Sequence, residues 1–585
     1  MKLNFNTGKF ALMKNVLCVE ILILFFTGIS ICGICQPYYN VKEYGAKGDG
    51  KNMDSEAINK VIETAAKSGG GTVFLPGGTY LSGSIRMKSN INLYLDAGAV
   101  LLAAPQNEEL KDYYDKAEFI PGEKKYQDEG HSYFQNSLIW GRNLKNVSIT
   151  GLGMIDGSGL AHVWESKKGI TGLANKSIAL IECTNVKIEG ITIFKGGWFA
   201  ILTTGCNLLT FNNLTIDTNR DGIDIDCCTN VIVSDCRINS PIDDAICPKS
   251  SFALGRTIVT ENMTITNCQV SAYRLGTMLD GTFKEEPIYY WTSRNGRIKF
   301  GTESNGGFRN VVVSNCIFRN CKGIAIECVD GGILENISIS NITMYNADDY
   351  PIYITLGDRL RDPNPGKSRG KNIFISNVIA YVNDSLSGIH ITGTPTSYLE
   401  NIRLNNISIL YNGGGKKSDG LYHFPELGKG YPEPGAIASL GNNIPVVNVP
   451  SYGIFARHVK DLEIDNLTVD CIKEDQRPAM ICIDIDGLKI EKFVAKITKD
   501  IPLAQFENVR NMVLYQTTVF DNGILAIHSG KWRLLKKGNK YQLYNLNIDK
   551  DCVNNVALKY TGILKEMIKK FAAMFTASGR VIRNL

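Results

Sequence analysis

The chain has 585 residues, of which 44% are hydrophobic and 21% charged, so it is not disordered as a whole. Its 63 basic and 58 acidic residues leave a net charge of +5, which is nearly neutral for this length and does not indicate a nucleic-acid or membrane-surface partner. The 57 glycines, present without low complexity, suit a fold with many turns.

The first residues are typical of an export signal. Three lysines precede an apolar run over residues 16–31, and Gly33 and Cys35 occupy the small-x-small positions before Gln36. We therefore expect residues 1–35 to be a signal peptide and the mature protein to be periplasmic or secreted. A lipoprotein signal that uses Cys32 or Cys35 is the alternative, which leaves a lipid anchor open. The later sequence contains no apolar run long enough to predict a membrane span.

Residues 36–120 are expected to form an N-terminal cap and the first coils. Asp54 precedes a segment with apolar residues at positions 57, 58, 61 and 62, a helical spacing. This pattern predicts a helix over residues 55–67, N-capped by Asp54. Such a helix would cover the open end of a repeat.

Short β-branched strings recur through the middle of the chain. Each opens with an asparagine, at Asn146, Asn185, Asn230, Asn262, Asn310, Asn336, Asn372 and Asn401, and Asp461 opens a variant. Polar and apolar residues alternate in them, so each strand has one buried face. Without long helices between the strands, the repeat predicts an all-β fold, a right-handed parallel β-helix over residues 121–520.

Two residue types in the repeat have more than one interpretation. Several of the asparagines match the glycosylation triplet, but a buried turn asparagine that bonds the backbone is the preferred interpretation. Cys236, Cys268 and Cys316 end similar strings, which favours cysteines stacked in the core over disulfides.

The cysteine and histidine spacing does not predict a metal site. The histidines at positions 131, 390, 423 and 458 are expected to be bonded surface side chains.

Residues 521–585 are expected to be a C-terminal extension. Its apolar residues at positions 563, 564, 567, 568, 571 and 575 follow helical spacing, which predicts a helix packed against the end or side of the solenoid.

The chemistry is concentrated in the strings "DTNRDGIDIDCC" and "SPIDDAICPKS". Asp221 and Asp243 are separated by 22 residues, close to one turn of the solenoid. Neighbouring strands lie ~4.8 Å apart, so we expect Asp221, Asp243 and Asp244 to form one cluster. Clustered carboxylates raise at least one pKa, which supplies a proton donor beside ionised bases, as glycoside hydrolysis requires. A Ca²⁺ site or solvated turn acids are the alternatives.

These strings resemble glycoside hydrolase family 28, the polygalacturonase-like β-helix enzymes. "NRDGIDID" is similar to the family's Asn-Thr-Asp segment and "DDAICPKS" to its Asp-Asp segment. The resemblance implies that Asp243 is the general acid and that Asp221 and Asp244 hold and deprotonate water. It also implies an inverting reaction with carboxyl groups ~6.5–9.5 Å apart. Asn219 would orient Asp221 or contact sugar, and Lys249 would lie by the cleft floor.

The sequence departs from the family pattern at two places. The family's Gly-His-Gly aligns with "NGR", which ends at Arg297, and its Arg-Ile-Lys aligns with "AIE", which ends at Glu327. A substrate carboxylate beside Glu327 would be repelled, so Arg297 and Lys299 are the expected compensating cations. Glu303 lies in "GTESNGGFRNV", which is similar to the family's Gly-Ser-Glu stretch.

Two further residues belong to the expected substrate site. Arg220 replaces the family's threonine, and would either keep Asp221 ionised or pair with Asp217 or Asp224. Trp198 would stack on a sugar ring or fill the core or rim.

The function predicted from these residues is an exported hydrolase of pectic polysaccharide, either galacturonate-type or rhamnogalacturonan-type. It would act as a monomer, without a cofactor or metal, and with a polysaccharide or oligosaccharide as its partner. A polysaccharide lyase on the same fold and a non-catalytic sugar-binding solenoid are the alternatives.

Overall fold

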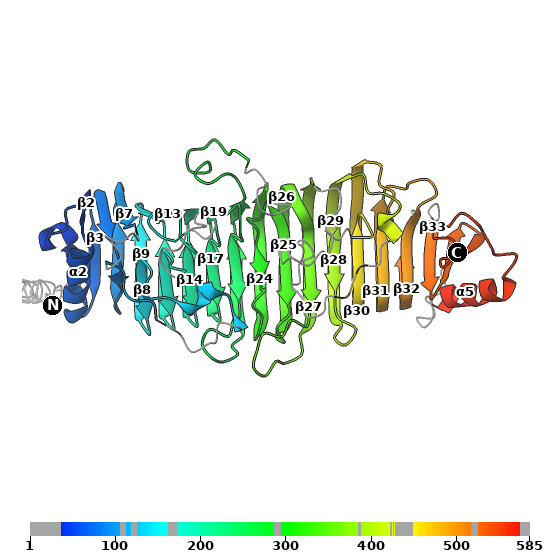
Figure 1. Cartoon of the computed structure of the whole chain (residues 1–585), viewed down its shortest axis with the longest axis horizontal. Helices are drawn as coiled ribbons and strands as arrows, with labels where there is room; N and C mark the ends of the chain where they lie inside the picture. Colours follow the sequence, from blue (N-terminus) through cyan, green and yellow to red (C-terminus); the bar gives the residue numbers. More distant parts are fainter. Residues whose placement is uncertain are drawn as a thin grey trace, which may run out of the picture.

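The computed structural model describes residues 37–105, 113–118, 126–161, 174–285, 294–383, 388–421, 424, 426, 449–515, 524–550 and 552–573. The predicted signal peptide lies outside the described residues. The described chain is a long solenoid of stacked parallel strands, with α2 at its N-terminal end and α5 at its C-terminal end (Figure 1). This confirms the predicted parallel β-helix. No helix in these ranges is long and apolar enough to cross a membrane.

Three faces make up the N-terminal half of the solenoid. Face P contains β1 (Tyr38–Asn40), β3 (Gly71–Leu75), β6 (Ile91–Leu95), β9 (Lys145–Gly151), β12 (Thr184–Glu189), β15 (Asn207–Asn212), β18 (Thr229–Ser234) and β21 (Thr260–Thr266). Face Q contains β2 (Asp49–Met53), β4 (Gly78–Ser82), β7 (Ala99–Ala103), β10 (Met154–Asp156), β13 (Thr192–Phe194), β16 (Thr215–Asp217), β19 (Arg237–Asn239) and β22 (Gln269–Ser271). Face R contains β5 (Ile85–Arg86), β8 (Ile139–Arg142), β11 (Ile178–Ile181), β14 (Ile201–Thr204), β17 (Ile223–Asp226) and β20 (Ile246–Lys249).

Longer strands continue these faces toward the C-terminus. Face R is extended by β23 (Lys299–Phe300), β25 (Lys322–Cys328) and β28 (Ile389–Thr392). Strands that run over more than one face are β24 (Gly307–Arg319), β26 (Ile333–Leu356), β27 (Arg369–Val382), β29 (Leu399–Gly413), β30 (Ile454–Lys473), β31 (Met480–Ala495) and β32 (Pro502–Tyr515). Short 3₁₀ turns occur at Val41–Tyr44, Glu129–Ser132 and Asp419–Leu421.

Alternation of side chains explains the core. On face P, every second residue points inward and stacks on its counterpart in the next turn. One such row is Val147, Val186, Leu209, Val231, Met263, Val311, Ile337, Ile373, Ile402, Leu462, Leu488 and Met512. Each is at most 2% exposed. Burying one such side chain contributes about 1.5–3 kcal/mol, so the stacked rows hold successive turns in register.

The repeat asparagines form a ladder on the surface. The residues from Asn146 to Asn401 predicted to open the strings have φ between 53° and 59°. In the ladder, the amide of Asn336 donates to Asn310 at 3.0 Å and accepts from Asn372 at 3.0 Å. The prediction of buried asparagines bonded to backbone is therefore wrong, because a left-handed turn residue points outward and finds its partner in the adjacent asparagine.

The cysteines behave as predicted. Every cysteine in the described part of the chain is free, and all but Cys552 are buried. Cys236, Cys268 and Cys316 lie in the core at no more than 1% exposure.

Each end of the solenoid carries a helix. Helix α2 (Ser55–Lys67) has the predicted bounds and buries Ile58, Val61 and Ile62. Asp54 does not cap it through its side chain, because that carboxylate accepts from the N–H groups of Lys47 and Gly48 instead.

The C-terminal extension adds a small antiparallel sheet. Strand β33 (Ile524–Ser529) pairs with β34 (Trp532–Lys537), which pairs with β35 (Lys540–Asn545). Helix α5 (Thr561–Ala573) buries Met567 and Phe571, as the spacing predicts, while residue 575 lies outside the described residues.

The ladder predicts a graded loss of stability. N336A removes two side-chain hydrogen bonds, each contributing about 0.5–1.5 kcal/mol, and leaves an alanine in a conformation that costs about 1–2 kcal/mol more. N336G removes the same bonds without that strain, because glycine tolerates positive φ. Urea unfolding should therefore rank wild type above N336G and N336G above N336A. Equal stability of the two variants would contradict the strain argument.

Candidate active site

The ends of two neighbouring strands bring the predicted acids together. Because Ile223 of β17 pairs with Ile246 of β20, the residue in register with Asp221 is Asp244. The Asp244 N–H donates to the Asp221 carboxylate at 3.0 Å. The turn contains one residue more than the 22-residue separation assumed from the sequence, so Asp243 is not the direct counterpart of Asp221.

The three carboxylates form the predicted cluster. Oxygen atoms of Asp221, Asp243 and Asp244 all lie within 4.8 Å of one another. The side chain of Asp243 is 26% exposed, whereas those of Asp221 and Asp244 are 2% and 3% exposed. Asp243 is therefore the carboxyl of this cluster most accessible to a substrate.

A further acid, Asp224, belongs to the same site and is fully buried. The Lys249 ammonium lies 3.1 Å from the Asp221 carboxylate and 3.4 Å from that of Asp224. The sequence contains the signal for Asp224, since "DGIDID" places Asp224 and Asp226 on one side of β17. We call Asp221, Asp224, Asp243 and Asp244 the acid cluster.

Basic side chains neutralise each member of the acid cluster. Arg220 Nε lies 3.2 Å from Asp243, Arg297 Nε lies 3.0 Å from Asp244, and Lys299 Nζ lies 3.5 Å from Asp244. The expected pairing of Arg220 with Asp217 or Asp224 is therefore wrong. Arg297 and Lys299 likewise pair with a protein carboxylate, that of Asp244, and their role toward substrate stays a prediction.

Burial raises the pKa of three of these acids. Burial, supported by the nearby charges of Asp224 and Asp244, raises the pKa of Asp221 to about 6 against the opposing pull of Lys249. Burial also raises the pKa of Asp224 to about 7. For Asp243, burial and the Asp221 charge raise the pKa to about 6, while Arg220 opposes the rise.

The segment before β8 adds two residues that the sequence did not reveal. Asp128 accepts from the Trp198 indole N–H at 3.4 Å, and the Arg220 guanidinium stacks over the Trp198 ring at 4.6 Å. Although burial works in the other direction, Arg220 holds the pKa of Asp128 below its ordinary value. Asp128 thus reaches Trp198 from a segment 70 residues earlier in the chain.

His131 is the second of these residues. It is fully buried, and its Nδ1 lies 3.3 Å from the Asp226 carboxylate, which also accepts from the Ser251 hydroxyl at 2.6 Å. The expectation of surface histidines is wrong for His131 and His390, which are 0% exposed, and for His458, which is 7% exposed. His423 lies outside the described residues.

The remaining predicted residues occupy different environments. Trp198 and Asn219 are half-buried, and the backbone carbonyl of Asn219 accepts from the Ser240 hydroxyl and the Ile242 N–H. Glu303 pairs with Arg361, which keeps the Glu303 pKa well below its ordinary value despite burial. Glu327 is 0% exposed, so the expectation that it meets substrate is wrong.

The comparisons with known proteins agree with this fold. The family described as rhamnogalacturonase A/epimerase, pectate lyase-like, matches residues 38–274. A probable polygalacturonase of Vitis vinifera is 26% identical over 303 residues, 48% of this chain and 60% of that protein. The chain has the pectate lyase-like β-helix fold and is a distant homologue of polygalacturonases.

Two further similarities complete the comparison. The crystal structure of an exopolygalacturonase from Thermotoga maritima superposes with a TM-score of 0.55 at 21% identity, over 74% of this chain and 91% of that one. Alginate lyase 7 of Azotobacter vinelandii is 49% identical over only 61 residues, 9% of this chain and 7% of that protein. The chain therefore covers less than two thirds of both sequence relatives.

The raised pKa values predict that stability falls as the solution becomes less acidic. Between the ordinary value of 3.8 and about 7, the folded state keeps a proton on Asp224 that the unfolded chain releases, so the free energy of unfolding decreases as pH rises through this range. In D224N the decrease in melting temperature from pH 5 to pH 8 should be smaller than in wild type. D235N, which changes an exposed aspartate, is the matched control and should show the same decrease in melting temperature as wild type. If the decrease in D224N also equals that of wild type, the burial argument is contradicted.

Proposed function

We propose that the protein is a glycoside hydrolase that cleaves pectic polysaccharide or oligosaccharide at the acid cluster. The observation that carries this proposal is the contrast between the accessible Asp243 and its buried neighbours Asp221 and Asp244. Hydrolysis needs one protonated carboxyl on the glycosidic oxygen and one carboxylate on the water. The cluster supplies both within one site.

Asp243 is assigned as the general acid. Its raised pKa keeps a proton available in mildly acidic solution, and it is the most exposed of the three acids. Once Asp243 has donated its proton to the leaving oxygen, the Arg220 guanidinium at 3.2 Å stabilises the carboxylate that remains.

Asp221 and Asp244 are assigned to the water. Buried carboxylates held by Lys249 and Arg297 have little freedom to bond a sugar carbon directly, but they can orient and deprotonate a water molecule. Activation of water by these acids would invert the anomeric centre. The predicted separation of ~6.5–9.5 Å is wrong for this structure, because in-register strands place oxygen atoms of the three acids within 4.8 Å of one another.

The substrate class rests on the relatives and on the accessible charge. The grapevine relative is named a polygalacturonase, and the matching family description names rhamnogalacturonase. Arg220 is the most exposed of the four cations paired with the acid cluster, at 12% against 4–8% for the others, so it is assigned to the uronate carboxylate. The amino-terminal sequence supports export of the enzyme as part of the same proposal.

A lyase is the second candidate. The short similarity to alginate lyase 7 favours it, and carboxylate oxygens are suitable Ca²⁺ ligands. A divalent cation at the acid cluster would, however, have to compete with basic side chains that already neutralise all four acids. The pairing of the four acids with basic side chains therefore favours hydrolysis over a Ca²⁺-dependent lyase reaction.

A product assay on the purified mature protein distinguishes the candidates. Homogalacturonan, rhamnogalacturonan and their oligomers would be incubated while reducing ends and ultraviolet absorbance are followed together. Hydrolysis gives reducing ends without absorbance. Absorbance would identify a lyase, and binding without either product would identify a sugar-binding solenoid.

D243N tests the role of the general acid. Removing the proton donor should lower turnover by at least about 10²-fold. D235N changes an exposed turn acid in the same way and should retain activity. Turnover of D243N near that of wild type would refute the assignment.

R220Q tests the electrostatic control of Asp243. Since Arg220 lowers the pKa of Asp243, its removal should raise that pKa further and move the alkaline limb of the kcat/KM profile to higher pH. Loss of a substrate contact alone would lower kcat/KM without moving this limb. R256Q, an exposed arginine nearby in the chain, is the control, and an unmoved limb in R220Q would contradict the pairing.

A further inference from the structure

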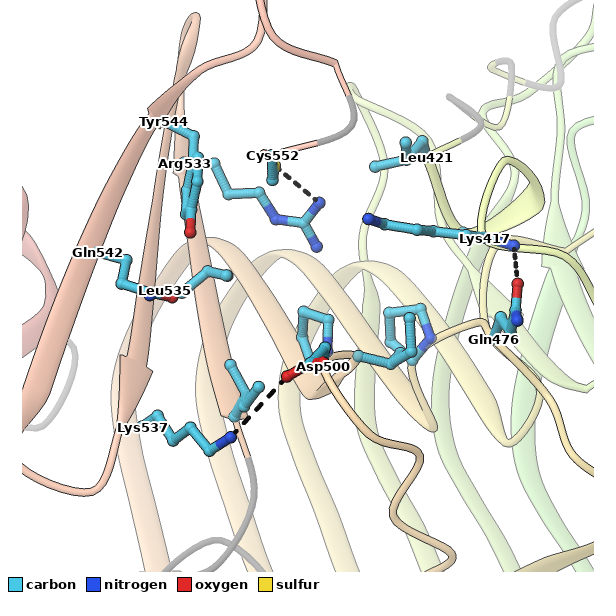
Figure 2. A pocket seen from close by; sticks show the side chains of 15 residues that line it. Lys417, Leu421, Gln476, Asp500, Arg533, Leu535, Lys537, Gln542, Tyr544 and Cys552 are labelled. Atoms are coloured by element: carbon cyan, nitrogen blue, oxygen red, sulfur yellow. Dashed lines mark hydrogen bonds and ion pairs between the residues drawn. The ribbon is translucent and has the colours of Figure 1, made fainter. Parts of the chain in front are cut away.

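A second polar pocket lies several turns away from the acid cluster. It has a volume of about 250 Å³ and is formed where the last turns of the solenoid meet the antiparallel strands β33–β35 (Figure 2). Strand residues Arg533, Lys537 and Tyr544 line it, together with Lys417 and Cys552 from the flanking segments. The proposed hydrolysis does not use these residues.

Arg533 is the central feature of the pocket. The residue is 4% exposed, and its guanidinium donates only to neutral partners, the Gln505 amide oxygen at 3.2 Å and the Cys552 sulfur at 3.7 Å. Its Nε has no hydrogen-bond partner, and across the described ranges no carboxylate lies within ion-pair distance of it. Burial consequently lowers the pKa of Arg533. A buried cation without a counter-ion is costly, and a bound anion would remove that cost.

Two further basic side chains, Lys417 and Lys537, line the pocket. Figure 2 shows the Lys417 ammonium and the Arg533 guanidinium pointing toward one another across the pocket. Both cations act on the Cys552 thiol, which places them at the same part of the lining. Asp500, the acid of the lining, already lies 4.0 Å from the Lys537 ammonium. The pocket therefore offers positive charge to a ligand.

Neutral groups complete the pocket. The amides of Gln476 and Gln542 and the Tyr544 hydroxyl supply donors and acceptors, and Pro478 and Pro502 supply apolar surface. Hydroxyl-bearing rings need this combination of polar groups and apolar contact. The volume is below the ~300–1,000 Å³ of a drug-sized site, so it suits a single sugar residue rather than a polymer chain.

We propose that this pocket binds a carboxylate-bearing sugar, with Arg533 and Lys417 on the carboxylate and the neutral groups on the hydroxyls. The ligand would be one uronate residue, free or at the end of an oligosaccharide. The pocket is a binding site and takes no part in bond cleavage.

Cys552 provides a local reporter of occupancy. It is the half-buried cysteine of the described chain, whereas the others are buried, and it touches Arg533. The intact protein would be alkylated with iodoacetamide, and the rate at Cys552 followed by mass spectrometry. Galacturonate should slow this alkylation, whereas galactose, which lacks the carboxylate, should not.

Variants identify the residues responsible. R533Q should abolish the protection and weaken galacturonate binding in calorimetry by at least about tenfold, as expected when a charged hydrogen-bond partner is lost. R533K should retain part of the protection and part of the galacturonate affinity, because the positive charge is kept. K417Q should weaken binding without burying a new group, and K569Q on the exposed side of α5 should behave as wild type.

The outcomes separate this site from the acid cluster. Alkylation reports on the pocket and product formation reports on the acid cluster, so R533Q should cleave short oligomers as wild type does. Unchanged binding in both R533Q and K417Q would overturn the proposal. Equal protection by inorganic phosphate would also overturn it, by showing a plain anion site. If Cys552 of the free protein does not react, the calorimetric comparison of R533Q with wild type decides.

Discussion

Parallel strands of adjacent turns lie about 4.8 Å apart, and this spacing forces residues one turn apart into contact. On the inside of the solenoid the rule produces apolar rows. At the ends of β17 and β20 it places carboxylates against one another, an arrangement that is unfavourable unless cations neutralise it or protons remain bound. In this structure the cations Arg220, Lys249, Arg297 and Lys299 pair with the cluster, and burial raises the pKa of three of its acids.

The outer side of face R positions the acid cluster. An apolar group that includes Phe134, Leu202 and Leu254 covers this side near β11 and β14, and a second group that includes Tyr353 and Phe455 covers it beyond β25. Between these two groups, the outward-facing position of face R carries charge. Leu202 of β14 is followed by Asp224 in the next turn, and Lys299 of β23 is followed by Ala325, where the position is apolar again. The charged residues are thus enclosed by apolar packing on both sides, which strengthens their electrostatic interactions.

Periodic features could be predicted from the sequence, and contacts between distant segments could not. The β-helix, helix α2 and the proximity of Asp221 to Asp243 and Asp244 all follow from local spacing. Asp224 was detectable from its alternation with Asp226 along β17. Its membership of the acid cluster, however, depends on its contact with Lys249, which local spacing does not predict. The roles of Asp128 and His131 depend on a segment that crosses to another turn, and the burial of Glu327 is visible only in the folded structure. Arg533 gives no signal in sequence, because its lack of a counter-ion is visible only in three dimensions.

The central claim is that a buried, cation-paired set of acids activates water while Asp243 protonates the leaving oxygen. Proton NMR of the anomeric signals during the first minutes of oligogalacturonide cleavage tests this most directly. The account predicts that the newly formed reducing end appears with inverted configuration, because Asp221 and Asp244 hold water instead of bonding the sugar. A product that first appears with retained configuration would contradict it, since one of these carboxylates would then have acted as the nucleophile.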